Sequence, residues 1–103
     1  MNADCFFDVY NDTVLRQYLV DMCRAFSKLP ESQEDLLQEA WIRIAESDAD
    51  CTTEYYMHEG FKGMEAFYRR ERRQDMSRRE IKTANERKRR VAKKYIIRVA
   101  QSP

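Results

Sequence analysis

Apolar residues recur at steps of three and four along much of the chain, which is the spacing of one face of an α-helix. The clearest such stripe consists of Leu15, Tyr18, Leu19, Met22, Phe26 and Leu29. The chain of 103 residues has only two glycines and two prolines, too few turn residues for a small barrel or sandwich. The sequence therefore predicts an all-α fold, a compact bundle of about four helices around one core.

The first two helices are bounded by recognisable flanking residues. The first is expected from Asn11 or Asp12 to about Lys28, and Pro30 would end it. The second is expected to begin at Ser32, whose spacing from Asp35 resembles a capping box, and to reach residues 46–47. Before them, residues 5–7 are expected to form at most a short extra turn packed on the core.

The third and fourth helices carry the remaining stripes. The third is expected to start at residue 52 or 53, with Gly60 as an alternative break point and a core stripe that ends at Tyr68. The fourth is expected from about Ala84 to Ala100, after a second capping box at residues 83–86. Its expected core stripe is Val91, Ala92, Tyr95, Ile96 and Val99. We expect residues 1–82 to form the main domain and residues 83–103 to form a basic helix that packs on it or extends from it.

Charge divides the chain into two halves of opposite sign. Residues 1–59 hold 13 acidic and 4 basic residues, whereas residues 60–103 hold 5 acidic and 15 basic residues. Such asymmetry favours an acidic partner, usually nucleic acid, for the basic half. The alternative is that the two halves simply attract each other.

Catalytic and metal-binding patterns are not evident. The three cysteines are widely spaced, no Cys-x-x-Cys pair occurs, and the lone His58 has no Cys or Ser partner at a telling spacing. No apolar run exceeds three residues, so neither a membrane span nor a signal core is expected. We expect a cytoplasmic protein with reduced thiols that is not an enzyme and needs no metal or cofactor.

The second helix has an apolar face and an opposite face of a different kind. Leu37, Ala40, Trp41 and Ile44 centre on the first, and Trp41 is interpreted as a core residue. The residues that centre on the opposite face are Asp35, Gln38, Glu39, Ile42 and Glu46. An apolar residue ringed by carboxylate and amide groups is typical of a surface that docks another helix. The alternative is a solvated face with one stray isoleucine, and burial of these residues in the monomer would exclude docking.

The third helix and the segment that follows it combine basic and aromatic residues. Guanidinium and ammonium groups bind phosphates, and the candidates on the basic face of the helix are Lys62, Arg69, Arg70 and Arg73. Tyr56 and Phe67, at the edge of this face, are candidates for stacking on unpaired bases. The alternative is that the two aromatic rings flank the core and the arginines only face water.

Two motifs in this region resemble a known family. Residues 34–44, Glu-Asp-Leu-Leu-Gln-Glu-Ala-Trp-Ile-Arg-Ile, resemble the "DLxQE" helix of bacterial RNA polymerase sigma factors. Residues 61–79 are more loosely similar to the segment "F…WLyrIArN…D..RR" of the small, extracytoplasmic-function type, and Asp75, Arg78 and Arg79 match its end. The chain departs from that segment at Met64-Glu65 and at residues 68–71. The resemblance covers about residues 15–79, the conserved second region of the family.

The resemblance implies a helical bundle with two partners. In sigma factors the Gln-Glu helix docks on the clamp coiled coil of core RNA polymerase, which would assign Asp35, Gln38, Glu39 and Ile42 to that contact. In sigma factors the next helix and its basic end bind the minus-ten promoter element. The resemblance would therefore place six residues on phosphates: Lys62, Arg69, Arg70, Arg73, Arg78 and Arg79. A complete sigma factor also has a helix-turn-helix domain, for which residues 80–103 leave no length.

Three functional interpretations follow. The first is a sigma-like initiation factor that binds polymerase and promoter DNA, with a separate protein supplying the helix-turn-helix domain. The second is a polymerase-binding regulator or interaction module without promoter recognition. The third is a general nucleic-acid-binding protein in which the Gln-Glu motif is accidental.

Overall fold

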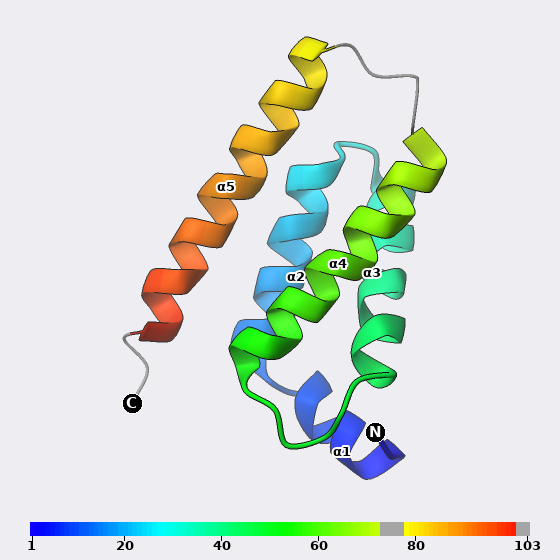
Figure 1. Cartoon of the computed structure of the whole chain (residues 1–103), viewed down its shortest axis with the longest axis vertical. Helices are drawn as coiled ribbons and strands as arrows, with labels where there is room; N and C mark the ends of the chain where they lie inside the picture. The colour runs from blue at the N-terminus through cyan, green and yellow to red at the C-terminus, as the bar shows by residue number, and fades with distance from the viewer. Residues whose placement is uncertain (73–77, 101–103) are drawn as a thin grey trace.

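The computed structural model, which describes residues 1–72 and 78–100, is built of helices, with no strand in those ranges (Figure 1). The elements are α1 (Ala3–Tyr10), α2 (Thr13–Phe26), α3 (Pro30–Ala45), α4 (Thr53–Arg72) and α5 (Arg78–Ala100). The predicted all-α bundle is confirmed. The expected number of about four helices is corrected to five in the described ranges, because residues 3–10 form a helix of their own.

The additional helix α1 is held by aromatic packing. The Asn2 side chain caps it by accepting a hydrogen bond from the Cys5 backbone N–H at 2.8 Å. The rings of Phe6 and Tyr10 then pack against Trp41 of α3, with centroid separations of 5.9 and 4.9 Å. Trp41 is therefore half-buried beneath α1, packed against the core cluster as expected.

Helix α2 lies at the centre of the bundle and packs against α3, α4 and α5 (Figure 1). Its predicted stripe is confirmed, since Leu15, Leu19, Met22 and Phe26 are each no more than 1% exposed. Leu29 is an exception, at 52% exposed, because α2 ends at Phe26 and the chain has turned away before it reaches Leu29. The other helices are arranged around this one element.

The connection from α2 to α3 differs from the sequence expectation. Helix α3 begins at Pro30, which was expected to end the preceding helix, and Ser32 lies inside the first turn. Proline is favoured at the first helical position because its missing N–H would have no intrahelical partner there. Ser27 supplies the polar contacts instead, accepting from the Leu29 N–H at its Oγ and from Gln33 Nε2 at its carbonyl. The predicted capping box at Ser32 is therefore wrong.

Helix α4 is continuous through both glycines, so the alternative break at Gly60 is not present. The glycines instead mark where α4 approaches its neighbours closely. A Cβ on Gly63 would lie 3.0 Å from the Glu39 carbonyl oxygen of α3, and one on Gly60 would lie 2.5 Å from Leu19 Cδ2 of α2. The glycines allow backbone contact that compensates for their low helix propensity.

Helix α5 begins at Arg78, before the expected start at Ala84. Thr83 is inside the helix, where its hydroxyl donates to the Arg79 carbonyl, so the second predicted capping box is also wrong. Tyr95 anchors α5 to α2: its ring is fully buried and its hydroxyl donates to Asp21 at 2.7 Å. Ile96, which was expected in the core stripe, is 67% exposed because Tyr95 takes the position facing α2.

We predict that Gly63→Ala destabilises the protein although alanine favours helix. The gain of about 1 kcal/mol in propensity is outweighed by overpacking of about 1–3 kcal/mol, because the opposing atom is a backbone carbonyl that cannot rotate away. Thermal and urea unfolding followed by circular dichroism measures the change. Ala66→Gly, at an exposed site of the same helix, is the control for propensity alone and should cost about 1 kcal/mol. A more stable Gly63→Ala protein would contradict the close approach of α3 and α4.

Candidate functional site

The outward face of α3 carries the predicted protein-binding residues. Asp35, Gln38 and Ile42 are exposed, and Ile42 has 46% of its surface accessible. The residues that α3 buries are Leu36, Ala40 and Ile44, together with the half-buried Leu37 and Trp41. An exposed isoleucine one turn from Gln38 and two turns from Asp35 places an apolar group among polar ones on a single helical face. The face is not covered by any of the described residues.

Glu39, the fourth member of the predicted set, lies at the edge of this face and is half-buried. Its carboxylate is 4.0 Å from Arg70 Nη2 of α4, and its carbonyl is the atom that Gly63 approaches. The predicted protein-binding and DNA-binding surfaces therefore meet at Glu39 and Arg70. The contact is long and exposed, so it contributes at most about 1 kcal/mol and leaves both groups accessible.

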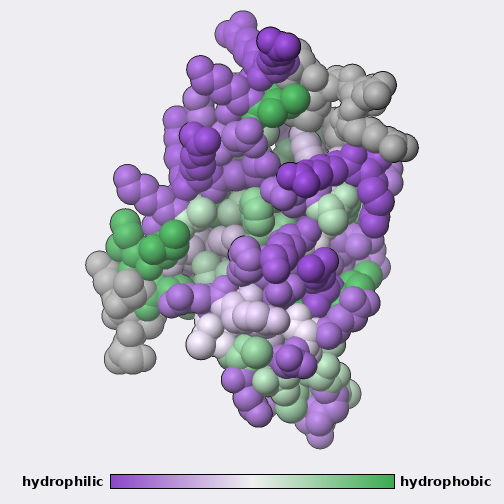
Figure 2. All heavy atoms as spheres, viewed as in Figure 1, coloured by the Kyte–Doolittle hydropathy of each residue, from purple (hydrophilic) through white to green (hydrophobic). Residues whose placement is uncertain are grey.

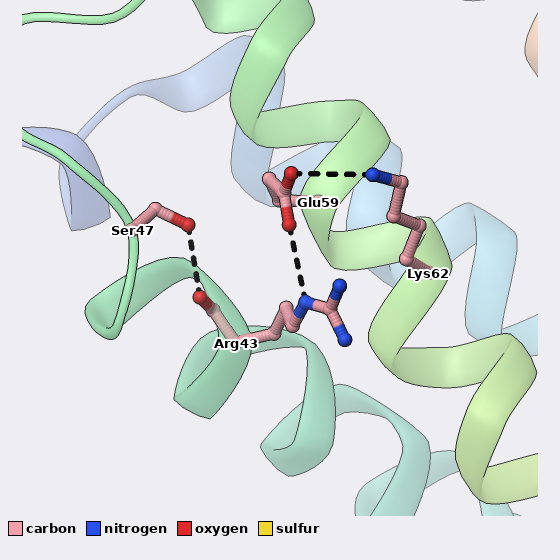
Figure 3. Close-up of polar contacts among 4 residues, drawn as sticks. All are labelled: Arg43, Ser47, Glu59 and Lys62. Atoms are coloured by element: carbon pink, nitrogen blue, oxygen red, sulfur yellow. Dashed lines mark hydrogen bonds and ion pairs between the residues drawn. The ribbon is translucent and has the colours of Figure 1, made fainter.

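A second ionic contact fixes α4 on α3 (Figure 3). Glu59 is almost buried, and its two oxygens pair separately with Arg43 Nε at 3.1 Å and Lys62 Nζ at 3.5 Å. Burial alone would raise the pKa of Glu59, but the hydrogen bond from Arg43 and the charge of Lys62 outweigh it, and the pKa is lowered. The carboxylate is therefore ionised at neutral pH and positions both cations.

Neither Glu59 nor Arg43 was predicted from the sequence to have a role. The i, i+3 spacing of Glu59 and Lys62 is a local signal that could have revealed that pair. Arg43 is 16 positions from Glu59 and joins it only because α3 packs on α4. Lys62 was expected to bind a phosphate. In the structure its ammonium group pairs with Glu59 of the same helix.

The other predicted phosphate-binding residues lie along the end of α4 and the start of α5. Arg69 pairs with Glu65 at 3.1 Å, and Arg78 and Arg79 are exposed on the first turn of α5. Arg73 lies outside the described residues. Hydrophilic side chains cover the upper part of α5 in Figure 2, where this helix begins. The structure thus leaves Arg69, Arg70, Arg78 and Arg79 accessible to solvent.

The two aromatic residues predicted to stack on bases have different environments. Tyr56 is only 4% exposed, and its hydroxyl donates to the Asp48 carbonyl and accepts from the Cys51 N–H. It holds the loop between α3 and α4, so its ring has no face for a base, and the stacking assignment is corrected. Phe67 is half-buried, with the Arg70 guanidinium 5.7 Å from its ring centroid. A base could reach this ring only after Arg70 moves.

The metal-ligating side chains of the described part of the chain are dispersed over the fold. No group of three or more His, Cys, Asp or Glu side chains there is placed to hold a metal ion. Cys23 is buried with its sulfur 3.8 Å from that of Met64, and burial raises the pKa of its thiol to about 12. Over the same residues, no helix is long and apolar enough to cross a membrane.

Comparison of the chain with protein-family models, with curated proteins and with solved structures found no match. The resemblance to sigma factors therefore depends on the motifs at residues 34–44 and 61–79 alone.

We predict that Glu59→Gln lowers the free energy of unfolding by about 1–3 kcal/mol at pH 7, because it removes the charge that two cations share. A carboxylate whose folded pKa is lowered stabilises the fold above its unfolded pKa and loses that effect as the pH falls through the folded value. The difference between the two proteins should therefore shrink as the pH is lowered below about 4.3, the ordinary value for Glu. Urea unfolding at a series of pH values measures this convergence. A constant difference across the series would exclude the ionised pair as its cause.

Proposed function

We propose that this protein is a sigma-like transcription factor that binds core RNA polymerase through the outward face of α3 and promoter DNA through the basic end of α4 and the start of α5. It performs no catalysis and acts in the cytoplasm, where polymerase and DNA are found. The partners and their residues come from the resemblance to sigma factors. The accessibility of those residues in the fold supports the assignment.

The observation that carries the proposal is the exposure of Ile42 beside Gln38 and Asp35. A helix that only filled the core would need its buried face alone, and Ile42 lies opposite that face. Desolvation of a central isoleucine provides affinity, while the surrounding carboxylates and amide select the partner. The clamp coiled coil of polymerase is the partner that the Gln-Glu motif implies.

The DNA side of the proposal uses the exposed cations of α4 and α5. Arg69 and Arg70 belong to surface ion pairs, and exchange of such a weak partner for a phosphate costs little. Arg78 and Arg79 extend the same charge onto α5. Phe67 is the remaining aromatic candidate for contact with a melted base.

We predict that Ile42→Glu prevents binding to purified bacterial core RNA polymerase while the fold is retained. Burial of an unpaired carboxylate at the centre of the contact is costly, so affinity should fall by more than about tenfold. Surface plasmon resonance with immobilised polymerase measures it. Ile96→Glu, which makes the same change at an exposed isoleucine of α5, is the matched control and should bind normally. Equal binding by both variants would remove the docking assignment of α3.

We predict that Arg69→Ala with Arg70→Ala weakens DNA binding and reduces its salt dependence. Removal of one phosphate-binding cation should lower the slope of log K against log salt concentration by about 0.9 for duplex DNA. Fluorescence anisotropy between 50 and 200 mM salt, roughly the range over which such interactions are screened, gives the slope. Arg16→Ala with Lys93→Ala removes two exposed cations elsewhere and serves as the control. An unchanged slope in the Arg69 and Arg70 variant would show that neither residue binds a phosphate.

A further inference from the structure

A shallow groove of about 410 Å³ lies between α2 and α5, and none of the residues assigned above to polymerase or DNA lines it. Its charged lining consists of Arg24 from α2, Arg87, Arg90 and Lys94 from α5, and a single acid, Asp21. The two helices lie side by side along much of their length (Figure 1). Cationic side chains from both helices therefore line the groove.

The single carboxylate of the groove does not neutralise these cations. Asp21 already accepts the Tyr95 hydroxyl at 2.7 Å, and Lys94 Nζ lies 3.8 Å from the same oxygen. Neither Arg24 nor Arg90 forms an ion pair with a residue in the described part of the chain, and both are exposed. The groove thus retains an excess of positive charge that the fold does not use.

One of the cations is held in place by the backbone. Arg87 Nε donates to the Ala25 carbonyl at 3.1 Å, near the end of α2. This bond uses one of the five N–H donors of the guanidinium and leaves the others for a ligand. Ala25 and Val91 add apolar surface to the lining. Arg87 is half-buried and anchored, and exposed arginines lie next to it in the groove. Because its side chain is already ordered, it loses less conformational entropy when a ligand binds.

The spacing of the α5 cations indicates the shape of the ligand. Arg87, Arg90 and Lys94 are at steps of three and four, so they follow one face of the helix over about 10 Å. A nucleic-acid strand carries phosphates at regular intervals along its backbone, so a row of three cations suits successive phosphates of one strand. A single phosphate ion would meet only part of this row.

We propose that the groove between α2 and α5 binds the phosphodiester backbone of nucleic acid, as a second contact separate from the promoter-binding surface. The contact is independent of base sequence, because its donors are guanidinium and ammonium groups that bind phosphate oxygens. It does not depend on polymerase binding or on the residues of α4. The part of α5 that follows Arg79, which the sigma resemblance does not cover, thereby gains a role.

Fluorescence anisotropy with a labelled 12-nucleotide single strand and the duplex of the same arbitrary sequence tests the proposal. Arg24→Glu with Arg90→Glu should weaken binding to both by about tenfold or more relative to the matched control, and should reduce the salt slope by about one to two units. The control, Arg89→Glu with Lys93→Glu, makes the same change of net charge at exposed α5 positions that do not line the groove. Equal weakening by both double variants would overturn the proposal, since only diffuse attraction would then be acting.

Inorganic tripolyphosphate, used as a competitor, distinguishes a backbone from a small free polyphosphate. If the groove binds a backbone, the competitor should be needed in large excess over the oligonucleotide to displace it. The backbone assignment would be overturned by two results together. Tripolyphosphate would displace the oligonucleotide at a concentration equal to that of the oligonucleotide, and the groove variant would bind the oligonucleotide with unchanged affinity. Should the glutamate variants fail to fold by circular dichroism, Arg24→Gln with Arg90→Gln and Arg89→Gln with Lys93→Gln give the same comparison. The arbitrary sequence and the intact α4 keep this result separate from that of the promoter-binding proposal.

Discussion

Burial of α2 is the constraint on which the other features depend. Its apolar stripe is removed from water by three helices at once, and full burial of each large side chain contributes about 1.5–3 kcal/mol. Because α2 occupies the centre, α3, α4 and α5 can each bury only the face that is turned toward it or toward an immediate neighbour. Their other faces remain in water. The surfaces available to partners are thus a consequence of how the core is filled.

The close contact between α3 and α4 arranges those outer faces. Gly63 brings the α4 backbone against Glu39, and Glu59 binds Arg43 and Lys62 on the same side of the molecule. The acidic and basic surfaces consequently meet at Glu39 and Arg70 instead of lying on opposite sides. Within the described residues, the two halves of the chain attract each other through pairs such as Glu59–Lys62, Glu39–Arg70 and Asp21–Lys94. On α5, Lys94 pairs with Asp21 of the acidic half, whereas the exposed Arg90 beside it forms no ion pair within the described part of the chain.

Periodicity predicted the elements well because burial of a stripe is a property of local sequence. The helices at 13–26 and 53–72 and the exposure of Ile42 are examples. The ends of the helices were predicted less well. Pro30 can end one helix or begin the next, and Thr83 can cap a helix or lie inside one, so neighbouring residues decide in each case. The burial of Tyr56 and the formation of the Arg43–Glu59 pair could not be predicted, because both depend on packing between elements, which no local pattern encodes. The groove between α2 and α5 was hidden for the same reason.

We propose that this small bundle presents the outward face of α3 to a protein and, at the same time, presents the basic end of α4 and the start of α5 to DNA. Site-specific photo-crosslinking in a mixture of the protein, core RNA polymerase and promoter DNA tests it directly. A photoreactive benzophenone side chain introduced at residue 42 is expected to crosslink to polymerase. The same side chain introduced in place of Lys82, beside Arg79 on α5, is expected to crosslink to DNA. Crosslinks from both positions to the same partner, or from neither position to any partner, would contradict this proposal.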